Sequence, residues 1–548
     1  MSNRFMKGAI ILSLSMFLTR ILGLLYVIPF QRLVGERGLA LYAYAYVPYS
    51  LLLTLSTLGI PVGIAKFVSK YNADGEYDTS RKIFRYGMIF MIVLGLIGFL
   101  IMWFSAPWFA RKALSGDDLY NTLEDVELAI RMVSFAIIVV PPMSILRGFF
   151  QGNQDMASTA ISQFVEQLVR VVLVIVGAFL VVQVFDGTTQ LAVQIAVFAA
   201  FVAGLSSLFV LYLYWAKNKQ HFDTLLKSSV RHRRRPVSKL FKELLTYALP
   251  FAILSLISTW FQMIDTMTFN AGMMRAEVDP IIAESLFGMY TISLLKIVTI
   301  PVSFAIAFGQ PLIPEVTEKV RTGDFKGVHK TLTSAILLTS FVTIPAVVGM
   351  SLLSNPLYVM LFNSQTEGLN EIGGQMFATG VFIGIFMALN SMLLAILQGI
   401  GNTSKSLIFL LIASGIKLVG NIVLIPRFEV QGAIIATILA YIFFMAMNYL
   451  EIRKRTGIET RIILKRHISI FLFTGLMSLA VWLVISVLNL FLDYTTSRLQ
   501  ATVYVTIAGI VGMLVYGWLA FYFDLAKLLF GDKLSYNRFR ARFRRSKT

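Results

Sequence analysis

A stripe of polar side chains interrupts one of the most apolar stretches of the chain. Ser162, Glu166 and Arg170 follow one another at intervals of four residues, and Gln163 and Gln167 lie beside them. Such intervals place side chains on one face of a helix. The guanidinium of an arginine presents a planar fork of donors that fits a phosphate, and a carboxylate one turn away can position or neutralise it. A phosphate-binding arginine and a self-neutralising ion pair both remain open.

Positive charge exceeds negative charge inside the apolar runs. Four cations lie near the middle of such runs: Arg20, Arg170, Lys296 and Lys417. A charge near the centre of a membrane helix costs at least ~2.5 kcal/mol, so it normally faces protein or water. Only Glu166 and Asp265 are available inside the runs to balance the four. We therefore predict a cavity that binds an anionic group such as phosphate or pyrophosphate, with the four cations as its substrate-binding residues.

Polar neighbours of these cations are candidates for positioning and gating. Gln262 and Asp265 lie roughly on one side of the helix predicted around residues 244–270. Asp265 could bind a coupling cation, gate the external mouth of the cavity or lock helices together, and its spacing does not choose among these roles. We predict that Glu166, Asp265, Gln163 and Gln262 line the cavity as positioning or gating residues.

The residue inventory indicates neither an enzyme nor a metal site. Cysteine is absent, and the four histidines have no metal-binding spacing. No phosphate-binding loop and no Gly-rich dinucleotide turn occurs. We expect no catalytic residue, no metal and no cofactor. If the predicted cavity carries its anionic ligand across the membrane, membrane potential and an exchanged monovalent cation are both compatible as driving forces for that transport.

The elements that position these residues are membrane helices. Of 548 residues, 57% are hydrophobic and only 14% are charged, with a mean hydropathy of +0.75. Apolar runs long enough to cross a hydrocarbon core favour helices over barrel strands. They lie at residues 7–30, 40–64, 84–106, 129–150, 157–184, 190–214, 244–270, 285–308, 332–353, 373–397, 405–425, 431–450, 468–491 and 501–523. The sequence predicts an all-α polytopic membrane protein with fourteen transmembrane helices, the first retained rather than cleaved as a signal peptide.

The net charge of +19 is concentrated in a few connections and in the tail. The largest basic blocks are residues 217–242, the segment from Glu451 to His467, and the tail from Asn537. The positive-inside rule then places both termini in the cytoplasm. Such basic blocks usually contact anionic lipid headgroups, so we expect membrane lipids rather than nucleic acid as partners.

An internal repeat divides the first twelve runs into two sets of six. Ile60-Pro61 matches Ile300-Pro301, Gly75-Glu76-Tyr77 matches Gly323-Asp324-Phe325, and Gln151-Gly152 matches Gln398-Gly399. These matches predict two pseudo-symmetric six-helix lobes, related by an axis along the membrane normal, that open alternately to the two sides. The predicted parts are an N-lobe (1–216), a basic cytoplasmic linker (217–242), a C-lobe (243–452), two further spans (453–525) and a basic cytoplasmic tail (526–548).

The repeat also pairs two of the cations. Arg170 and Lys417 each lie 19 residues after the glutamine of a Gln-Gly pair. Glu166 is equivalent to Ala413 and has no acidic counterpart in the second copy. This asymmetry favours Arg170 as the residue that binds phosphate and Glu166 as its positioning partner.

Four segments resemble a known family of transporters. They are RFMKGAIILSLSMFLTRILGLLYVIPFQRLVG at the N-terminus, LRGFFQGNQDMASTAISQFVEQLVRV from Leu146, TIPVSFAIAFGQPLIPEV from Thr299 and LQGIGNTSKSLIF from Leu397. They are similar to the multidrug/oligosaccharidyl-lipid/polysaccharide exporter superfamily, and most similar to the MurJ-type lipid II flippases in its polysaccharide biosynthesis branch (YtgP/SpoVB-like). The resemblance implies a lipid-facing groove for a polyprenyl tail at the last two spans. It also matches Arg20 to an arginine of the family's first span.

The resemblance implies a function as well as a fold, and it implies that the chain lies in the plasma membrane of a bacterium. Lipid II, the undecaprenyl-pyrophosphate-linked peptidoglycan precursor, would be moved from the cytoplasmic to the outer leaflet by alternating access. Other cell-wall synthesis proteins are candidate partners, and a monomer is expected. Three alternatives stay open: a flippase for another undecaprenyl-linked glycan (capsule, teichoic or spore-cortex precursor), a drug/cation antiporter, and a membrane scaffold that transports nothing.

Overall fold

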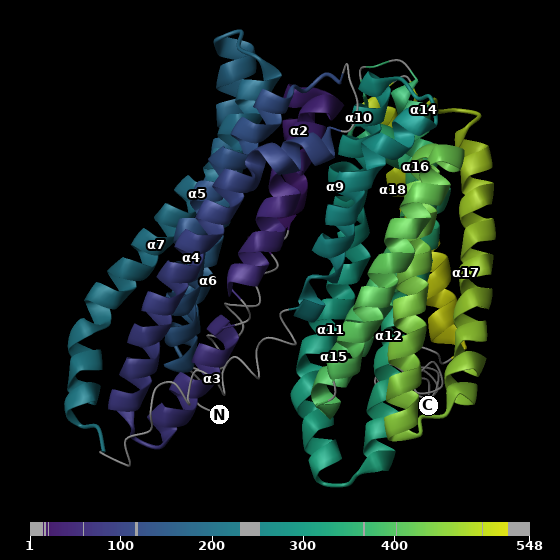
Figure 1. Cartoon of the computed structure of the whole chain (residues 1–548). Coiled ribbons are helices and arrows are strands. Elements are labelled where there is room, and N and C mark those ends of the chain that lie inside the picture. The colour runs from purple at the N-terminus through teal and green to yellow at the C-terminus, as the bar shows by residue number, and fades with distance from the viewer. Residues whose placement is uncertain are drawn as a thin grey trace, which may run out of the picture. The chain divides into compact units, whose positions relative to one another are not determined.

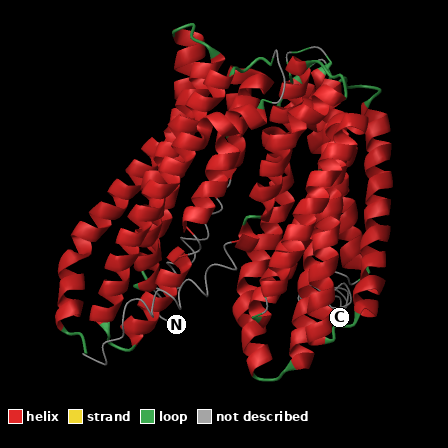
Figure 2. Cartoon of the chain, viewed as in Figure 1, coloured by secondary structure: helices red, strands yellow, loops and turns green. Residues whose placement is uncertain are grey.

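The computed structural model describes residues 15, 18–19, 21–57, 60–114, 119–230, 253–364, 366, 368–401, 403–495 and 497–523. All regular elements in these ranges are helices, and none of the described residues forms a strand (Figures 1 and 2). In chain order the helices are α2 (Val27–Thr57), α3 (Ile60–Ala73), α4 (Tyr77–Ala113), α5 (Leu123–Gly152), α6 (Met156–Phe179), η1 (Leu180–Val184), α7 (Thr189–Lys227), α9 (Ile257–Arg275), α10 (Pro280–Gly288), η2 (Met289–Leu294), α11 (Leu295–Arg321), α12 (Phe325–Leu352), α13 (Ser354–Leu361), α14 (Leu369–Gly380), α15 (Ile383–Ile400), α16 (Ser404–Thr456), α17 (Thr460–Leu488) and α18 (Arg498–Tyr522). The prediction of an all-α polytopic membrane protein is confirmed.

The predicted count of fourteen spans is not confirmed. Within the described ranges, eleven helices are long and apolar enough to cross a membrane. Three places account for the difference. The first two runs join at Gly35, which has a non-helical backbone inside α2, and the eleventh and twelfth join at a similar break at Glu429 inside α16. The seventh run begins among residues outside the described ranges, and α9 is its described part.

The internal repeat reappears as the same turn at equivalent places. Gly75 connects α3 to α4, and Gly323 connects α11 to α12. Their φ angles are 75° and 73°, in the left-handed region that glycine adopts without a steric penalty. An acidic residue follows each glycine, and the next helix begins directly after it. The match that the sequence predicted here is therefore also a match in backbone geometry.

The second pair of matching glycines packs on a matching pair of valines. A Cβ added at Gly152 would lie 2.6 Å from the side chain of Val68, and one added at Gly399 would lie 2.9 Å from that of Val316. These contacts join α5 to α3 and α15 to α11. Both are too close for any residue larger than glycine, so the Gln-Gly motif marks an equivalent close helix approach in each copy.

Two compact units make up the chain, residues Met1–Ile292 and Ser293–Thr548. In the first unit α4, α5, α6 and α7 lie side by side, and α9 and α10 pack against α2 (Figure 1). The boundary between the units therefore falls later than the predicted linker at 217–242. In addition, α7 continues to Lys227, so the first part of that linker is helical. The predicted ranges of the lobes, linker, last two spans and tail stay predictions.

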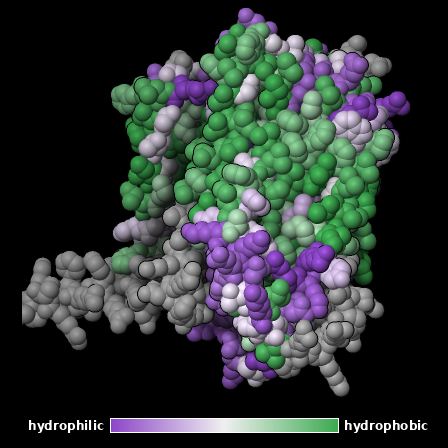
Figure 3. Space-filling model, turned by 90° about the vertical axis from the view of Figure 1, so that its left-hand side faces the viewer, coloured by the Kyte–Doolittle hydropathy of each residue, from purple (hydrophilic) through white to green (hydrophobic). Residues whose placement is uncertain are grey.

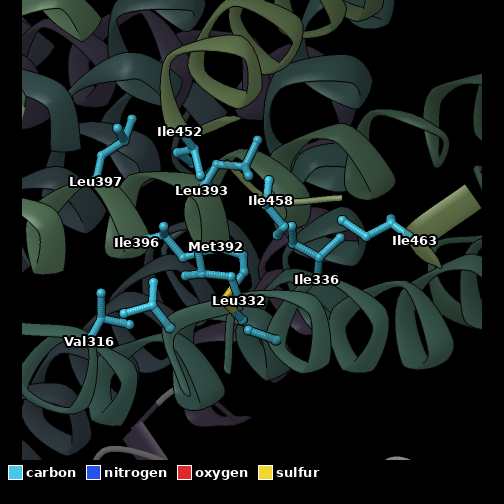
Figure 4. Packing of buried hydrophobic residues seen from close by; sticks show 12 residues of the cluster. Val316, Leu332, Ile336, Met392, Leu393, Ile396, Leu397, Ile452, Ile458 and Ile463 are labelled. Atoms are coloured by element: carbon cyan, nitrogen blue, oxygen red, sulfur yellow. The ribbon is translucent and has the colours of Figure 1, made fainter. Parts of the chain in front are cut away.

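The surface and the interior of the units are both apolar. Exposed large apolar side chains line α4, α6, α17 and α18, which is the pattern of helices that face lipid. The space-filling view shows apolar residues along the helices and hydrophilic residues gathered toward their ends (Figure 3). In the second unit, side chains of α11, α12, α15, α16 and α17 form a buried cluster around Leu332, Met392 and Ile396 (Figure 4).

Candidate functional site

Three charged side chains from α5 and α6 form a connected group in the first unit. Glu166 contacts two arginines: its Oε2 lies 2.7 Å from Arg147 Nη2, and its Oε1 lies 2.9 Å from Arg170 Nη2. The side chains keep 13–16% of their surface exposed. Two guanidinium groups and one carboxylate leave one net positive charge. We call Arg147, Glu166 and Arg170 the arginine trio.

Hydrogen bonds to serine hold the first member of the trio in place. Arg147 Nε donates to Ser162 Oγ at 3.0 Å, and its Nη2 donates to Ser207 Oγ at 2.8 Å. Ser162 belongs to α6 and Ser207 to α7. Arg147 therefore connects α5 to both neighbouring helices.

The third member of the trio lies beside tyrosines of α2. Arg170 Nη1 donates to the Tyr46 hydroxyl over 3.4 Å. The rings of Tyr42 and Tyr46 stack at 5.2 Å between centroids, and the Tyr49 ring lies 5.3 Å from that of Tyr46. Among the described residues, no hydrogen-bond partner is present for the buried Tyr49 hydroxyl or for the buried Arg170 Nε. Arg170 thus retains an unused donor in a partly buried, polar place, which is what an anion needs.

The polar stripe of the sequence is confirmed as one face of α6. Ser162, Glu166 and Arg170 all make contacts on the same side of this helix. Gln163, also on α6, is half-buried, and its side-chain oxygen lacks a hydrogen-bond partner within the described part of the chain. The predicted ion pair between Glu166 and Arg170 is present, but Glu166 shares its charge with a second arginine. Phosphate binding by Arg170 stays a prediction.

Lys417, the predicted counterpart of Arg170, lies in a different setting. It is fully buried in α16, and its Nζ donates to Ala433 O at 3.1 Å and to Thr437 Oγ1 at 2.5 Å. These partners follow the break at Glu429, so Lys417 connects the two halves of α16. The geometry supports a role in holding the halves together, and a direct contact with substrate would need them to separate.

The other predicted site residues are spread over both units. Arg20 lies outside the described residues. Lys296 is half-buried near the start of α11, in the second unit. Asp265 of α9 is buried and accepts a hydrogen bond from the Tyr290 hydroxyl at 3.1 Å, and Gln262 is half-buried one turn earlier. Arg170 belongs to the first unit, and Lys296 and Lys417 belong to the second. The substrate-binding role of the four predicted cations stays a prediction.

Sequence reasoning missed two parts of the site. Arg147 falls in the motif LRGFFQG near the end of a predicted span, where an arginine can reach the headgroup region. The tyrosines belong to the segment LYAYAYVPYS, which the hydropathy pattern treats as part of an ordinary span. The only signal for Arg147 was that Glu166 had one predicted partner and room for two.

A second polar cluster joins α2, α9, α10 and the segment before α5. The buried Glu284 accepts hydrogen bonds from the backbone N–H of Tyr120 and Asn121 and, at 2.6 Å, from the Asn121 side chain. Asn270 Nδ2 donates to the Tyr44 hydroxyl at 2.7 Å. This cluster was not predicted, because its members are distant in sequence.

A glycine lets α10 approach α2 closely beside this cluster. A Cβ at Gly288 would lie 2.3 Å from Glu36 O and 2.7 Å from Ala40 N, both backbone atoms. The rings of Tyr44 and Phe287 stack at 4.8 Å. The backbones of α10 and α2 are therefore in direct contact at this point.

The fold and the site define a membrane transporter of a known family. Residues 5–319 match the family described as "Polysaccharide biosynthesis protein". The chain belongs to this family, which confirms the predicted membership.

Among individual relatives, the chain is 38% identical to the lipid II flippase MurJ of Bacillus subtilis (strain 168), over 97% of this chain and 98% of that protein. It is 27% identical to the stage V sporulation protein B of the same organism, over 61% of this chain and 62% of that protein. Two solved structures share the fold. A lipid II flippase MurJ in an inward closed conformation has a TM-score of 0.65 at 16% identity and covers 94% of this chain and 99% of its own. An inward-facing multidrug resistance transporter of the MATE family has a TM-score of 0.63 at 14% identity, over 79% of this chain and 94% of its own.

Proposed function

We propose that this protein is a lipid II flippase of the bacterial membrane, which carries lipid II from the cytoplasmic to the outer leaflet for cell-wall synthesis. The observation that carries the proposal is the 38% identity to the lipid II flippase MurJ over nearly the full length of both chains. The arginine trio adds a physical reason, because a diphosphate is the most strongly charged group of such a cargo. An isolated net positive charge among membrane helices suits it.

Arg170 is the proposed phosphate contact. Among the described residues, its Nε has no hydrogen-bond partner, and its Nη1 makes only the long contact to Tyr46. A guanidinium with spare donors can bind phosphate oxygens in a bidentate manner, and a partly desolvated site strengthens each such bond. Tyr46 and Tyr49 offer hydroxyl groups beside it. Arg20 and Lys296 are further proposed phosphate contacts, whereas Lys417 is proposed to hold the two halves of α16 together.

Alternating access would move the headgroup while the polyprenyl tail stays in lipid. We place both termini in the cytoplasm. We place the last two spans, α17 and α18, beside the polyprenyl tail of the cargo. The candidate driving forces for transport are membrane potential acting on the cationic site and exchange of a monovalent cation. The candidate positioning or gating residues are Glu166, Asp265, Gln163 and Gln262. The protein would act as a monomer, alone or with other cell-wall synthesis proteins.

Replacement of Arg170 tests this proposal in cells. The host is depleted of the protein and complemented with Arg170→Ala, Arg170→Lys or, as a matched control, Arg131→Ala. Arg131 also lies on a membrane helix and pairs with a glutamate, Glu127, but belongs to no part of the trio. We expect Arg170→Ala to reach the membrane yet to leave lipid II inaccessible to an outer-leaflet probe. Arg170→Lys should retain part of the activity, and the control most of it.

Normal lipid II exposure in the Arg170→Ala strain would contradict the assigned role of Arg170. Accumulation of a different undecaprenyl-linked glycan in the depleted host would instead contradict the cargo. Such a glycan is the second candidate, because its diphosphate would suit the same net positive site. A drug/cation antiporter is the least favoured, since its cargo is cationic and the trio is net positive.

A further inference from the structure

The two arginines that share Glu166 are held very differently. Arg147 makes short contacts of 2.7–3.0 Å to Glu166, Ser162 and Ser207, on two helices. Arg170 makes one short contact, at 2.9 Å, and that contact is to the same carboxylate. Within the described residues, its Nε has no hydrogen-bond partner. Arg147 is thus the anchored member of the trio, and Arg170 is the member with a hydrogen-bond donor left over.

The charge of the trio depends on the anchored member. Glu166 and Arg170 alone would form a neutral pair one helical turn apart, with little attraction for an anion. Arg147 adds a second positive charge on the other carboxylate oxygen. Because the three side chains are mostly buried, water screens these charges weakly and each one matters more than it would at a surface.

We propose that Arg147 is a positioning residue for substrate binding. It fixes Glu166 and neutralises its charge, so that the charge and the spare donors of Arg170 serve a diphosphate. This inference rests on the proposed function, since it assigns a partner to the residue that would bind the cargo. Arg147 itself, anchored by two serines and the carboxylate, does not need to touch the substrate.

The arrangement also lets Arg170 change partners at low cost. When a diphosphate arrives, Arg170 can leave Glu166 Oε1 for a phosphate oxygen while Arg147 stays on Oε2. A partly buried carboxylate left with no cation would be strongly disfavoured. The anchored arginine therefore removes the main penalty on the exchange, and release of the cargo returns Arg170 to Glu166.

The proposal is tested by removing the charge of Arg147 alone and together with the charge of Glu166. Arg147→Gln leaves Glu166 free to neutralise Arg170, whereas the double variant Arg147→Gln with Glu166→Gln restores one net positive charge. Arg147→Lys keeps the charge, and Arg131→Gln is the matched control on α5. For each full-length variant, membrane insertion, apparent Tm, binding of inorganic pyrophosphate and exposure of lipid II at the outer leaflet are measured.

We expect Arg147→Gln to weaken pyrophosphate binding and lipid II exposure by about tenfold or more, the value of one charge-assisted contact. The double variant should recover to within about threefold of the parent protein, a difference well under 1.4 kcal/mol. Arg147→Lys and Arg131→Gln should resemble the parent. This rescue distinguishes a charge role from a packing role, because Glu166→Gln removes a charge without adding volume and so cannot repair lost packing.

Failure to see the rescue, or an Arg147→Gln variant that behaves like the parent, would overturn the role of Arg147. The pyrophosphate measurement separates this outcome from failure of the proposed function. If the parent protein does not expose lipid II but the variants still bind pyrophosphate in the expected order, the proposed cargo is wrong and the role of Arg147 stands. If neither measurement follows that order, the role of Arg147 is wrong.

Discussion

Alanine at the two repeat glycines, Gly152 and Gly399, should strain the two halves of the protein in the same way and to a calculable degree. A Cβ at Gly152 would lie 2.6 Å from two atoms of the Val68 side chain and 2.9 Å from a backbone oxygen, where ordinary contacts are 3.4–4 Å. A valine in a helix has one strongly preferred rotamer, so it cannot turn aside and the helices must move apart. Overpacking of this kind costs about 1–3 kcal/mol, and the contact with backbone places Gly152→Ala toward the upper end.

The corresponding change at Gly399 is expected to be milder. Its Cβ would approach Val316 to 2.9 Å and a backbone oxygen to 3.1 Å. The required shift is smaller, so Gly399→Ala should cost about 1–2 kcal/mol. Both glycines lie in the last turn of their helices, and the helix propensity of alanine therefore offsets little of the strain.

Thermal unfolding of the purified variants measures this effect. At about 1–2 °C per kcal/mol for a chain of this size, Gly152→Ala should lower the apparent Tm by a few degrees. Combining Gly152→Ala with Val68→Ala should cost less than the sum of the two single changes, by about 1 kcal/mol. The control is Gly415→Ala in α16, whose Cβ would meet nothing within 4 Å, and it should be neutral or mildly stabilising. Strict additivity, or a Gly152→Ala protein as stable as the control, would refute the reasoning.

Three further changes address other contacts. Lys417→Ala removes the bonds to the second half of α16, so it should lower the apparent Tm of the purified protein; unchanged stability would argue against a supporting role. Glu284→Gln weakens the cluster around Asn121, so a cysteine introduced at Leu119 in this cysteine-free chain should react faster with a thiol reagent, and an equal rate would contradict the contact. Lys319 lowers the pKa of Glu315, which lies beyond the membrane span, so the pair stabilises the protein above the ordinary glutamate pKa. That stability is lost as pH falls through the lowered value, and Lys319→Met should remove this pH dependence of the apparent Tm.

The hydropathy pattern was sufficient to predict the helices and the face of α6, because both depend on local periodicity. The repeat was also predictable from sequence, since Gly75 and Gly323 serve the same turn in both copies. Local patterns determine which residues share a helix face. They do not determine which neighbouring helix packs against that face.

That distinction explains the residues that were missed or placed differently. Arg147 reaches Glu166 only because α5, α6 and α7 pack together, and the sequence made no prediction about it. Lys417 was predicted to face a cavity, but its side chain packs against the second half of the same element. Gly420 closely approaches Ala436: a Cβ added at Gly420 would lie 2.8 Å from the Ala436 Cβ. This contact depends on the way the two halves of α16 pack together, which periodicity in the sequence does not reveal.

The most direct test of the central claim is the exposure of lipid II at the outer leaflet in a host whose only copy of this protein carries Arg170→Ala. The account predicts that lipid II accumulates on the cytoplasmic side although the variant is inserted in normal amount, and that Arg131→Ala exposes lipid II as the unaltered protein does. Normal outer-leaflet exposure with Arg170→Ala would contradict it.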